Sequence, residues 1–217
     1  MNVLNKYFNK VYVISSYATH SRLSDLLLFL DTENIQYELI IAPKKKYFKP
    51  DYDKTLVNEG AQSLISANES IFLKESYLKS DSFFIFEDDV NFDVNYVEKF
   101  NFFISQIPEK WDIINFGYHA HNNHLHTKFS EFNKYYNLQD KEEIVGTHAV
   151  AYKKNTVNFI LNSIEGSVYP IDWFLSRNVY SNFNVYIPID KIFYASSYRD
   201  YETDKNEFYK KYKSEIG

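Results

Sequence analysis

The stretch Phe83-Phe84-Ile85-Phe86-Glu87-Asp88-Asp89-Val90 joins four consecutive apolar residues to three consecutive carboxylates. The apolar run predicts a buried strand, and the acidic residues follow at its exit. Neighbouring carboxylates repel one another, and a divalent cation bound to their oxygens would cancel that repulsion. In an extended chain Glu87 and Asp89 point to one side and Asp88 to the other, so two carboxylates could face one ligand. The alternative is a strand that ends in a solvated acidic turn.

Extended and helical patterns alternate on both sides of this strand. A β-branched run at residues 11–14, leucines at helical spacing from Ser21, and a second apolar run at residues 37–42 predict a β-α-β unit, which is nearly always right-handed and parallel. Further helices are expected at residues 61–78, 95–107, 155–164 and within 169–180, and further strands at residues 111–117, 144–152 and 185–188. The sequence therefore predicts an α/β domain with a mainly parallel sheet flanked by helices.

The acidic residues occupy a special position in such a fold. Ligands of open α/β sheets bind outside the carboxyl ends of the strands, and Glu87-Asp88-Asp89 follows directly after one strand. Fold and residue chemistry thus point to the same place, and we expect a ligand site there.

Composition limits the class of partner. The 217 residues suffice for one substantial core, and a formal net charge of −5 argues against nucleic-acid binding through counterion release. Cysteine is absent, which excludes disulfides and thiolate chemistry. No apolar run has the length of a signal peptide at residues 1–10 or of a membrane span elsewhere. We expect a cytoplasmic protein, at most peripheral to the inner face of a membrane.

Five segments in order resemble motifs of glycosyltransferase family 25, the group that contains bacterial lipooligosaccharide galactosyltransferases and collagen galactosyltransferases. The segments are Val11 to Ile14 with Arg22 in the helix that follows, Phe83 to Val90, Trp111 to Gly117, Gly146 to Tyr152, and Ile171 to Leu175. They cover about residues 10–180. Two features depart from the family pattern: Ser15-Ser16 replaces an Asn-Leu pair, and residues 63–68 lack a Ser-His pair.

The resemblance implies a GT-A-like fold, with a Rossmann-type sheet, in one domain over residues 1–217. The nucleotide-sugar half would cover about residues 10–117 and the acceptor-side half about residues 118–200. Asp89 would ligate Mn²⁺ or Mg²⁺, and Glu87 would contact the metal shell or the nucleoside ribose. Asp88 would position the sugar or accept hydrogen bonds from the backbone. The chemical need is general, because a nucleoside diphosphate leaving group gathers negative charge that a divalent ion stabilises.

Three further residues are candidates for the reaction. An inverting transfer needs a base for the acceptor hydroxyl, and Asp172 is the choice because it precedes Trp173 in the late motif. The alternative for Asp172 is to cap the short helix after Pro170. Arg22 could pair with a donor phosphate, or could be a surface arginine. His148 could lie near the donor sugar, or could be a buried core histidine.

A histidine-rich stretch contains His119, His121, His124 and His126. Closely spaced histidines can bind a transition metal, but this stretch lacks the cysteines or the helical His-x-x-x-His spacing of common zinc sites. A substrate loop with incidental histidines is the favoured interpretation.

The function expected from the resemblance is metal-dependent transfer of a hexose, with galactose the first candidate, from a UDP-sugar to a glycan acceptor hydroxyl with inversion. The pathway would be surface glycan or lipooligosaccharide biosynthesis. The alternative is a catalytically inactive relative that binds nucleotide sugars or carbohydrate. A phosphohydrolase with a paired-Asp nucleophile is disfavoured because Val90 and Asn91 follow the acidic residues.

Overall fold

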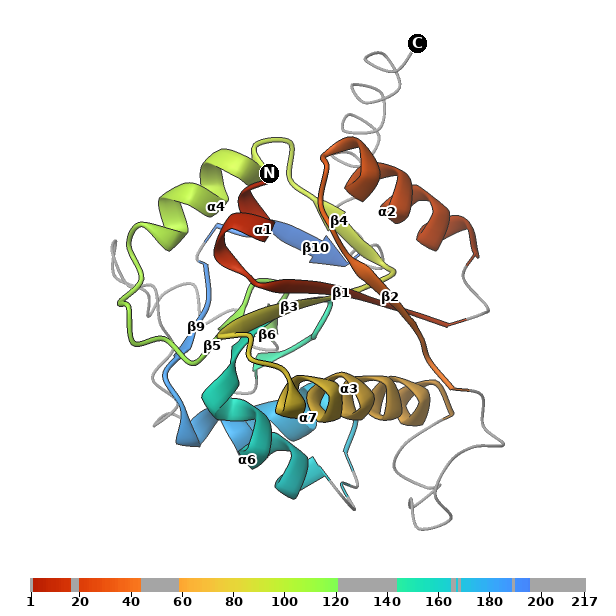
Figure 1. The fold of residues 1–217 in the computed structure, drawn as a ribbon, viewed down its shortest axis with the longest axis vertical. Helices are drawn as coiled ribbons and strands as arrows, with labels where there is room; N and C mark the ends of the chain where they lie inside the picture. The colour runs from red at the N-terminus through yellow and green to blue at the C-terminus, as the bar shows by residue number, and fades with distance from the viewer. Residues whose placement is uncertain are drawn as a thin grey trace.

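A computed structural model describes residues 2–16, 20–43, 59–120, 144–164, 167, 169–188 and 190–195. Its centre is a six-stranded sheet in the order β2-β1-β3-β8-β5-β9 (Figure 1). The strands are β1 (Lys10–Ser15), β2 (Glu38–Ile41), β3 (Ser82–Glu87), β5 (Ile113–Asn115), β8 (Ala149–Lys153) and β9 (Val185–Tyr186). The mainly parallel α/β sheet predicted from the sequence is confirmed.

One strand of the sheet runs against the others. β1 is parallel to β2 and β3, and β5 is parallel to β9, whereas β8 is antiparallel to both of its neighbours, β3 and β5. The first residues of β8 therefore lie beside the last residues of β3 and β5. This arrangement brings residues 146–149 to the edge of the sheet where parallel strands end.

Helices cover both faces of the sheet (Figure 1). The helices are α1 (Val3–Tyr7), α2 (His20–Thr32), α3 (Glu59–Tyr77), α4 (Tyr96–Ile104), α6 (Lys154–Ile164) and α7 (Ile171–Phe174). A π-helical turn at Leu175–Val179 and a 3-10 turn at Tyr180–Asn182 continue α7. Among these residues, no helix is long and apolar enough to cross a membrane.

Side-chain alternation divides the core into two clusters. Tyr12, Phe83 and Ile85 pack with α3, α6 and α7 on one face, because alternate residues of a strand share a face. Phe84 and Phe86 pack with α1, α2 and α4 on the other. This second cluster is largely aromatic and contains many ring contacts, such as the one between Phe84 and Phe86 at 4.5 Å between centroids. Both faces of β3 are thus buried, as its unbroken apolar run predicts.

Two small sheets were not expected from the sequence. Val90–Phe92 forms β4, which pairs with β10 at Phe193–Ala195, and β6 (His119–Ala120) pairs with β7 (Ile144–Val145). Helix α1 was not expected either, although Asn2 caps it by accepting a hydrogen bond from the Leu4 N–H. Short elements of this kind carry too few residues for a periodic pattern to emerge.

Candidate functional site

The acidic residues at the exit of β3 do not continue the strand. Strand β3 ends at Glu87, Asp88 and Asp89 form a turn, and β4 begins at Val90. The alternation expected for an extended chain therefore stops at Glu87. Each of the three carboxylates meets a different environment, and their chemistry has to be considered separately.

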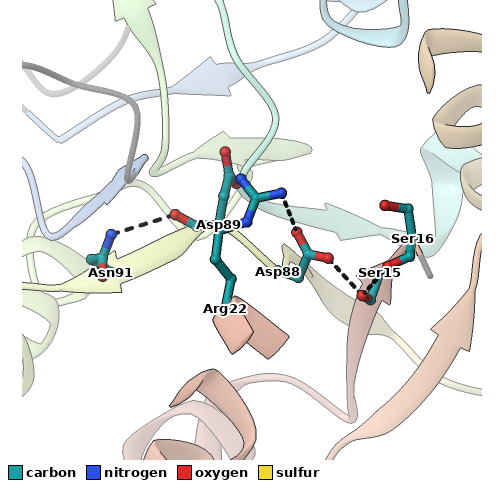
Figure 2. A network of polar contacts seen from close by, with 6 residues as sticks. All are labelled: Ser15, Ser16, Arg22, Asp88, Asp89 and Asn91. Carbon is teal, nitrogen blue, oxygen red and sulfur yellow. Dashed lines mark hydrogen bonds and ion pairs between the residues drawn. The ribbon is translucent and has the colours of Figure 1, made fainter. Parts of the chain in front are cut away.

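Asp88 contacts residues of two other elements, β1 and α2. The Ser15 hydroxyl, at the end of β1, donates a hydrogen bond of 2.6 Å to Asp88 Oδ2, and Arg22 Nη2 on α2 lies 3.7 Å from Asp88 Oδ1 (Figure 2). The Asp88 side chain is buried, whereas the side chain of Arg22 is 42% exposed. A role for Asp88 in positioning a sugar stays a prediction. In the structure, Asp88 connects the end of β3 to β1 and α2 through its contacts with Ser15 and Arg22.

Asp89 has a buried oxygen without a partner. Among the described residues, Asp89 Oδ1 is shielded from solvent and accepts no hydrogen bond. Burial of the carboxyl group raises its pKa, Asp88 raises it further, and the guanidinium of Arg22 opposes both effects. Figure 2 shows the side chain of Arg22 rising from α2 toward the two aspartates. A buried, unsatisfied carboxylate oxygen is costly, and such atoms in a native fold call for a ligand, ion or water.

Glu87, the last residue of β3, is held by the segment that precedes β8. Its Oε1 accepts a hydrogen bond of 2.5 Å from the Thr147 hydroxyl, and its backbone N–H donates to the carbonyl of His148 at 3.1 Å. Burial raises the pKa of Glu87 from 4.5 to about 8, with further contributions from the charges of Asp89 and Asp172, while the Thr147 hydrogen bond lowers it. The charges of the neighbouring aspartates oppose ionisation of Glu87, as expected where carboxylates gather.

Asp172 lies in the first turn of α7. It is not the N-cap residue, because Pro170 occupies that position. Its Oδ1 accepts a hydrogen bond from the Trp173 N–H at 2.9 Å, and its Oδ2 accepts one from the Gly146 N–H at 3.2 Å. Both oxygens of the carboxylate are thereby oriented by backbone donors, one local and one from the segment between β7 and β8.

Two other predicted residues have clear positions. Arg22 is at the start of α2, with Nη2 3.7 Å from Asp88 Oδ1, and its contact with a donor phosphate stays a prediction. His148 is 3% exposed, and its ring packs so closely on Gly117 that a Cβ at that glycine would lie 2.5 Å from His148 Cδ2. The position of His148 is that of a core histidine, and its proposed contact with a donor sugar stays a prediction.

Three residues near the site had no role in the sequence analysis: Ser15, Asn115 and Thr147. Ser15 and Asn115 are the last residues of β1 and β5, and both are buried. A polar residue that ends an apolar strand of an α/β sheet was the available signal, and it is the same signal that identified Glu87. Thr147 stands inside a segment that was quoted only for its resemblance.

The donor set fits a hard divalent cation of the kind that the fold implies. Glu87 and Asp89 offer carboxylate oxygens, one of them buried without a partner. In the described parts of the chain, no three His, Asp or Glu side chains converge into a ready metal cluster. Mg²⁺ commonly binds through one or two carboxylates, with water and substrate phosphates as its other ligands, so two protein carboxylates suffice.

The histidine-rich stretch cannot be judged in the same way. His121, His124 and His126 lie outside the described residues, and of His119 only the backbone, in β6, is described. A metal role for these histidines stays a prediction.

The six-stranded, mainly parallel sheet flanked by helices is a fold of the GT-A type. The chain is similar to the crystal structure of a glycosyltransferase involved in the glycosylation of the major capsid of PBCV-1, at a TM-score of 0.52 and 9% identity, over 92% of this chain and 98% of that chain. It is similar to S. aureus TarS 1-349 at a TM-score of 0.52 and 11% identity, over 92% of this chain and 64% of that one. No family profile and no curated protein sequence matches the chain.

At these identities the likeness shows the fold. The GT-A-like fold expected from the sequence is therefore confirmed, whereas membership of glycosyltransferase family 25 stays a prediction.

Proposed function

We propose that this protein is a metal-dependent glycosyltransferase that moves a hexose from a UDP-sugar to a glycan acceptor hydroxyl. The observation that carries the proposal is the buried, unpartnered Oδ1 of Asp89 beside Glu87, at the carboxyl edge of a GT-A type sheet. A fold stores such an unfavourable arrangement mainly where a ligand relieves it. The fold alone supports a transferase, and the acidic turn supports the use of a cation.

The donor side of the site would rest on three residues. Asp89 and Glu87 would hold Mn²⁺ or Mg²⁺, which when bound supplies a Lewis acid for the charge that develops on the diphosphate leaving group. Arg22 would contact a donor phosphate, because its guanidinium is exposed, lies beside the acidic turn and offers several donors. Asp88 would hold Arg22 in place from the side of β3.

The acceptor side would rest on Asp172. Its carboxylate is oriented by the N–H groups of Trp173 and Gly146, and its charge acts on Glu87, so it belongs to the same site as the acidic turn. A base held in one orientation can accept the proton of an acceptor hydroxyl as the new glycosidic bond forms. Inversion, galactose as the sugar, and a surface glycan as the acceptor are proposed from the resemblance to family 25.

A panel of UDP-sugars with and without Mn²⁺ tests donor and metal together. Thermal shift should report binding of UDP plus Mn²⁺, and release of UDP should report transfer or slow donor hydrolysis that EDTA abolishes. Binding without turnover over all donors and acceptors would favour the inactive carbohydrate-binding relative. Turnover that is insensitive to EDTA would refute the metal role.

A further inference from the structure

The three residues before β8 connect the two ends of the candidate site. The Thr147 hydroxyl donates to Glu87 Oε1 at 2.5 Å, and the Gly146 N–H donates to Asp172 Oδ2 at 3.2 Å. The His148 carbonyl accepts from the backbone N–H of Glu87. One short segment, residues 146–148, therefore contacts the carboxylate proposed for the metal and the carboxylate proposed as the base.

Gly146 is the flexible point of this segment. Its φ of 91° lies in the left-handed region, where glycine is preferred, and it has no Cβ to restrict its ψ. The relative orientation of the two peptide groups that meet at its Cα, one with its N–H and the other with its carbonyl, is consequently not fixed by the residue itself. An external contact has to hold the Gly146 peptide groups.

Asn115 supplies that contact from the end of β5. Its side chain is fully buried, and its Nδ2 donates to the Gly146 carbonyl at 2.9 Å and to the Tyr180 hydroxyl at 3.1 Å. Its Oδ1 accepts from the Gly117 N–H at 3.1 Å. The amide is thereby fixed on both sides, since a buried group with three hydrogen bonds has one favourable orientation.

We propose that Asn115 is a positioning residue for Asp172, and that it acts by clamping the carbonyl of Gly146. This inference rests on the proposed function of Asp172 as the base. Asn115 does not touch the substrate; it holds the peptide group that follows the Gly146 Cα, and so the position of the Cα from which the preceding N–H is presented to the Asp172 carboxylate. Thr147 performs the corresponding task for Glu87 at the metal end.

Tyr180 offers a matched control within the same network. Tyr180→Phe removes one hydrogen-bond partner of the Asn115 amide and leaves the bond from Asn115 to Gly146 in place. Asn115→Ala removes both bonds and also the acceptor of the Gly117 N–H, whereas Asn115→Asp keeps the side-chain volume and an acceptor oxygen while replacing the NH₂ donor. All three variants disturb a buried hydrogen bond, but only the Asn115 variants release Gly146.

The experiment combines kinetics with amide exchange. Asn115→Ala should lower kcat about tenfold or more and leave the KM for the UDP-sugar within about twofold, because a misplaced base affects the chemical step. Tyr180→Phe should keep kcat within about threefold. The Gly146 amide, followed by NMR, should exchange faster in Asn115→Ala and stay protected in Tyr180→Phe. Thr147→Val should instead weaken Mn²⁺ binding. The Mn²⁺ concentration that gives half-maximal activity should rise, and this change should be larger than the change in kcat.

The outcomes separate the two proposals. If Asn115→Ala does not fold, Asn115→Asp gives the same comparison. Unchanged protection of Gly146 in the Asn115 variant, or an equal loss of kcat in Tyr180→Phe, would overturn the positioning role. If the wild-type protein transfers no sugar, the proposed function fails, and the exchange of Gly146 still decides whether Asn115 holds the turn.

Discussion

Two buried carboxylates differ in their hydrogen bonding. Glu75 lies beneath the sheet on α3, and Asp89 lies in the turn at the end of β3. Glu75, on α3, is fully buried, and its two oxygens accept hydrogen bonds from the hydroxyls of Tyr12 and Ser80, at 2.6 Å for Tyr12. Asp89 has an oxygen that is equally shielded from water and has no donor among the described residues. The chain supplies hydrogen-bond donors to both oxygens of Glu75, as expected for a carboxylate with a structural role. At Asp89 one oxygen has no such donor and can bind a ligand.

Replacing the unsatisfied carboxylate gives the largest expected effect. Asp89→Asn should lower metal-dependent transfer by roughly 100-fold or more, because the proposed cation loses a charged ligand. Without metal the same variant should be more stable by about 1 kcal/mol, since one member of a repelling cluster is removed. UDP release and chemical denaturation in EDTA measure the two effects.

Asp93→Asn is the matched control, because Asp93 lies outside the turn and pairs with Lys99 at 2.7 Å. It should retain activity. A stability loss in metal-free Asp89→Asn, or full activity in that variant, would remove the distinction between Asp89 and a structural carboxylate.

The satisfied carboxylate should respond in the opposite manner. Glu75→Leu should lower the free energy of unfolding by about 2–4 kcal/mol, because the hydroxyls of Tyr12 and Ser80 both lose their acceptor. Activity per folded molecule should stay within about twofold. Glu75→Gln keeps one carbonyl oxygen and should cost less. A selective loss of kcat in Glu75→Leu at full folding would show that the contrast between the two regions is wrong.

The raised pKa of Glu87 predicts a pH dependence of stability. Because the folded state holds a proton that the unfolded state releases above about 4.5, stability should fall as the pH rises from about 4.5 to about 8 and then level off. Glu87→Gln should lose this part of the slope. Urea midpoints at several pH values measure it for both proteins, and parallel curves would contradict the assignment.

Substitutions of the two residues that contact Asp88, Ser15 and Arg22, should have the smallest effects, and they should differ in kind. Ser15→Ala should cost about 1–2 kcal/mol, because the Asp88 carboxylate loses a buried hydrogen bond. Arg22→Gln should cost under about 1 kcal/mol, since the ion pair at 3.7 Å is partly exposed, but should raise the donor KM several-fold. Thermal unfolding and kinetics with one UDP-sugar distinguish the two. A donor KM unchanged in Arg22→Gln would argue that Arg22 is a surface arginine.

The long regular elements could be predicted from the sequence because their apolar periodicity is strong. Strand β3 has an unbroken apolar run, and α6 has Val157, Ile160 and Ile164 on one buried face. The position of the acidic residues at the end of a parallel strand could also be predicted, whereas their role as a ligand site stays a prediction. These are properties of neighbouring residues, which a single sequence displays.

The rest of the site depends on contacts between distant segments. Thr147 meets Glu87 across 60 positions, and Asn115 meets Tyr180 across 65. No periodic pattern encodes such pairs; the first follows from the antiparallel placement of β8 beside β3, and the second from the packing of the turn after α7 against the end of β5. The extended backbone expected at the three carboxylates is not observed, because the chain turns after Glu87 to pair β4 with β10.

The antiparallel strand β8 also has a consequence for how the chain folds. β3 and β5 are close in sequence but are not neighbours in the sheet, because β8, which is made later, lies between them. A ribosome-bound chain that ends before residue 149 can therefore not complete the central sheet, and its exposed strand edges would remain open to wrong pairing. Because Gly146 and Thr147 directly precede β8 and contact Asp172 and Glu87, closure of the sheet and assembly of these two carboxylates become one event.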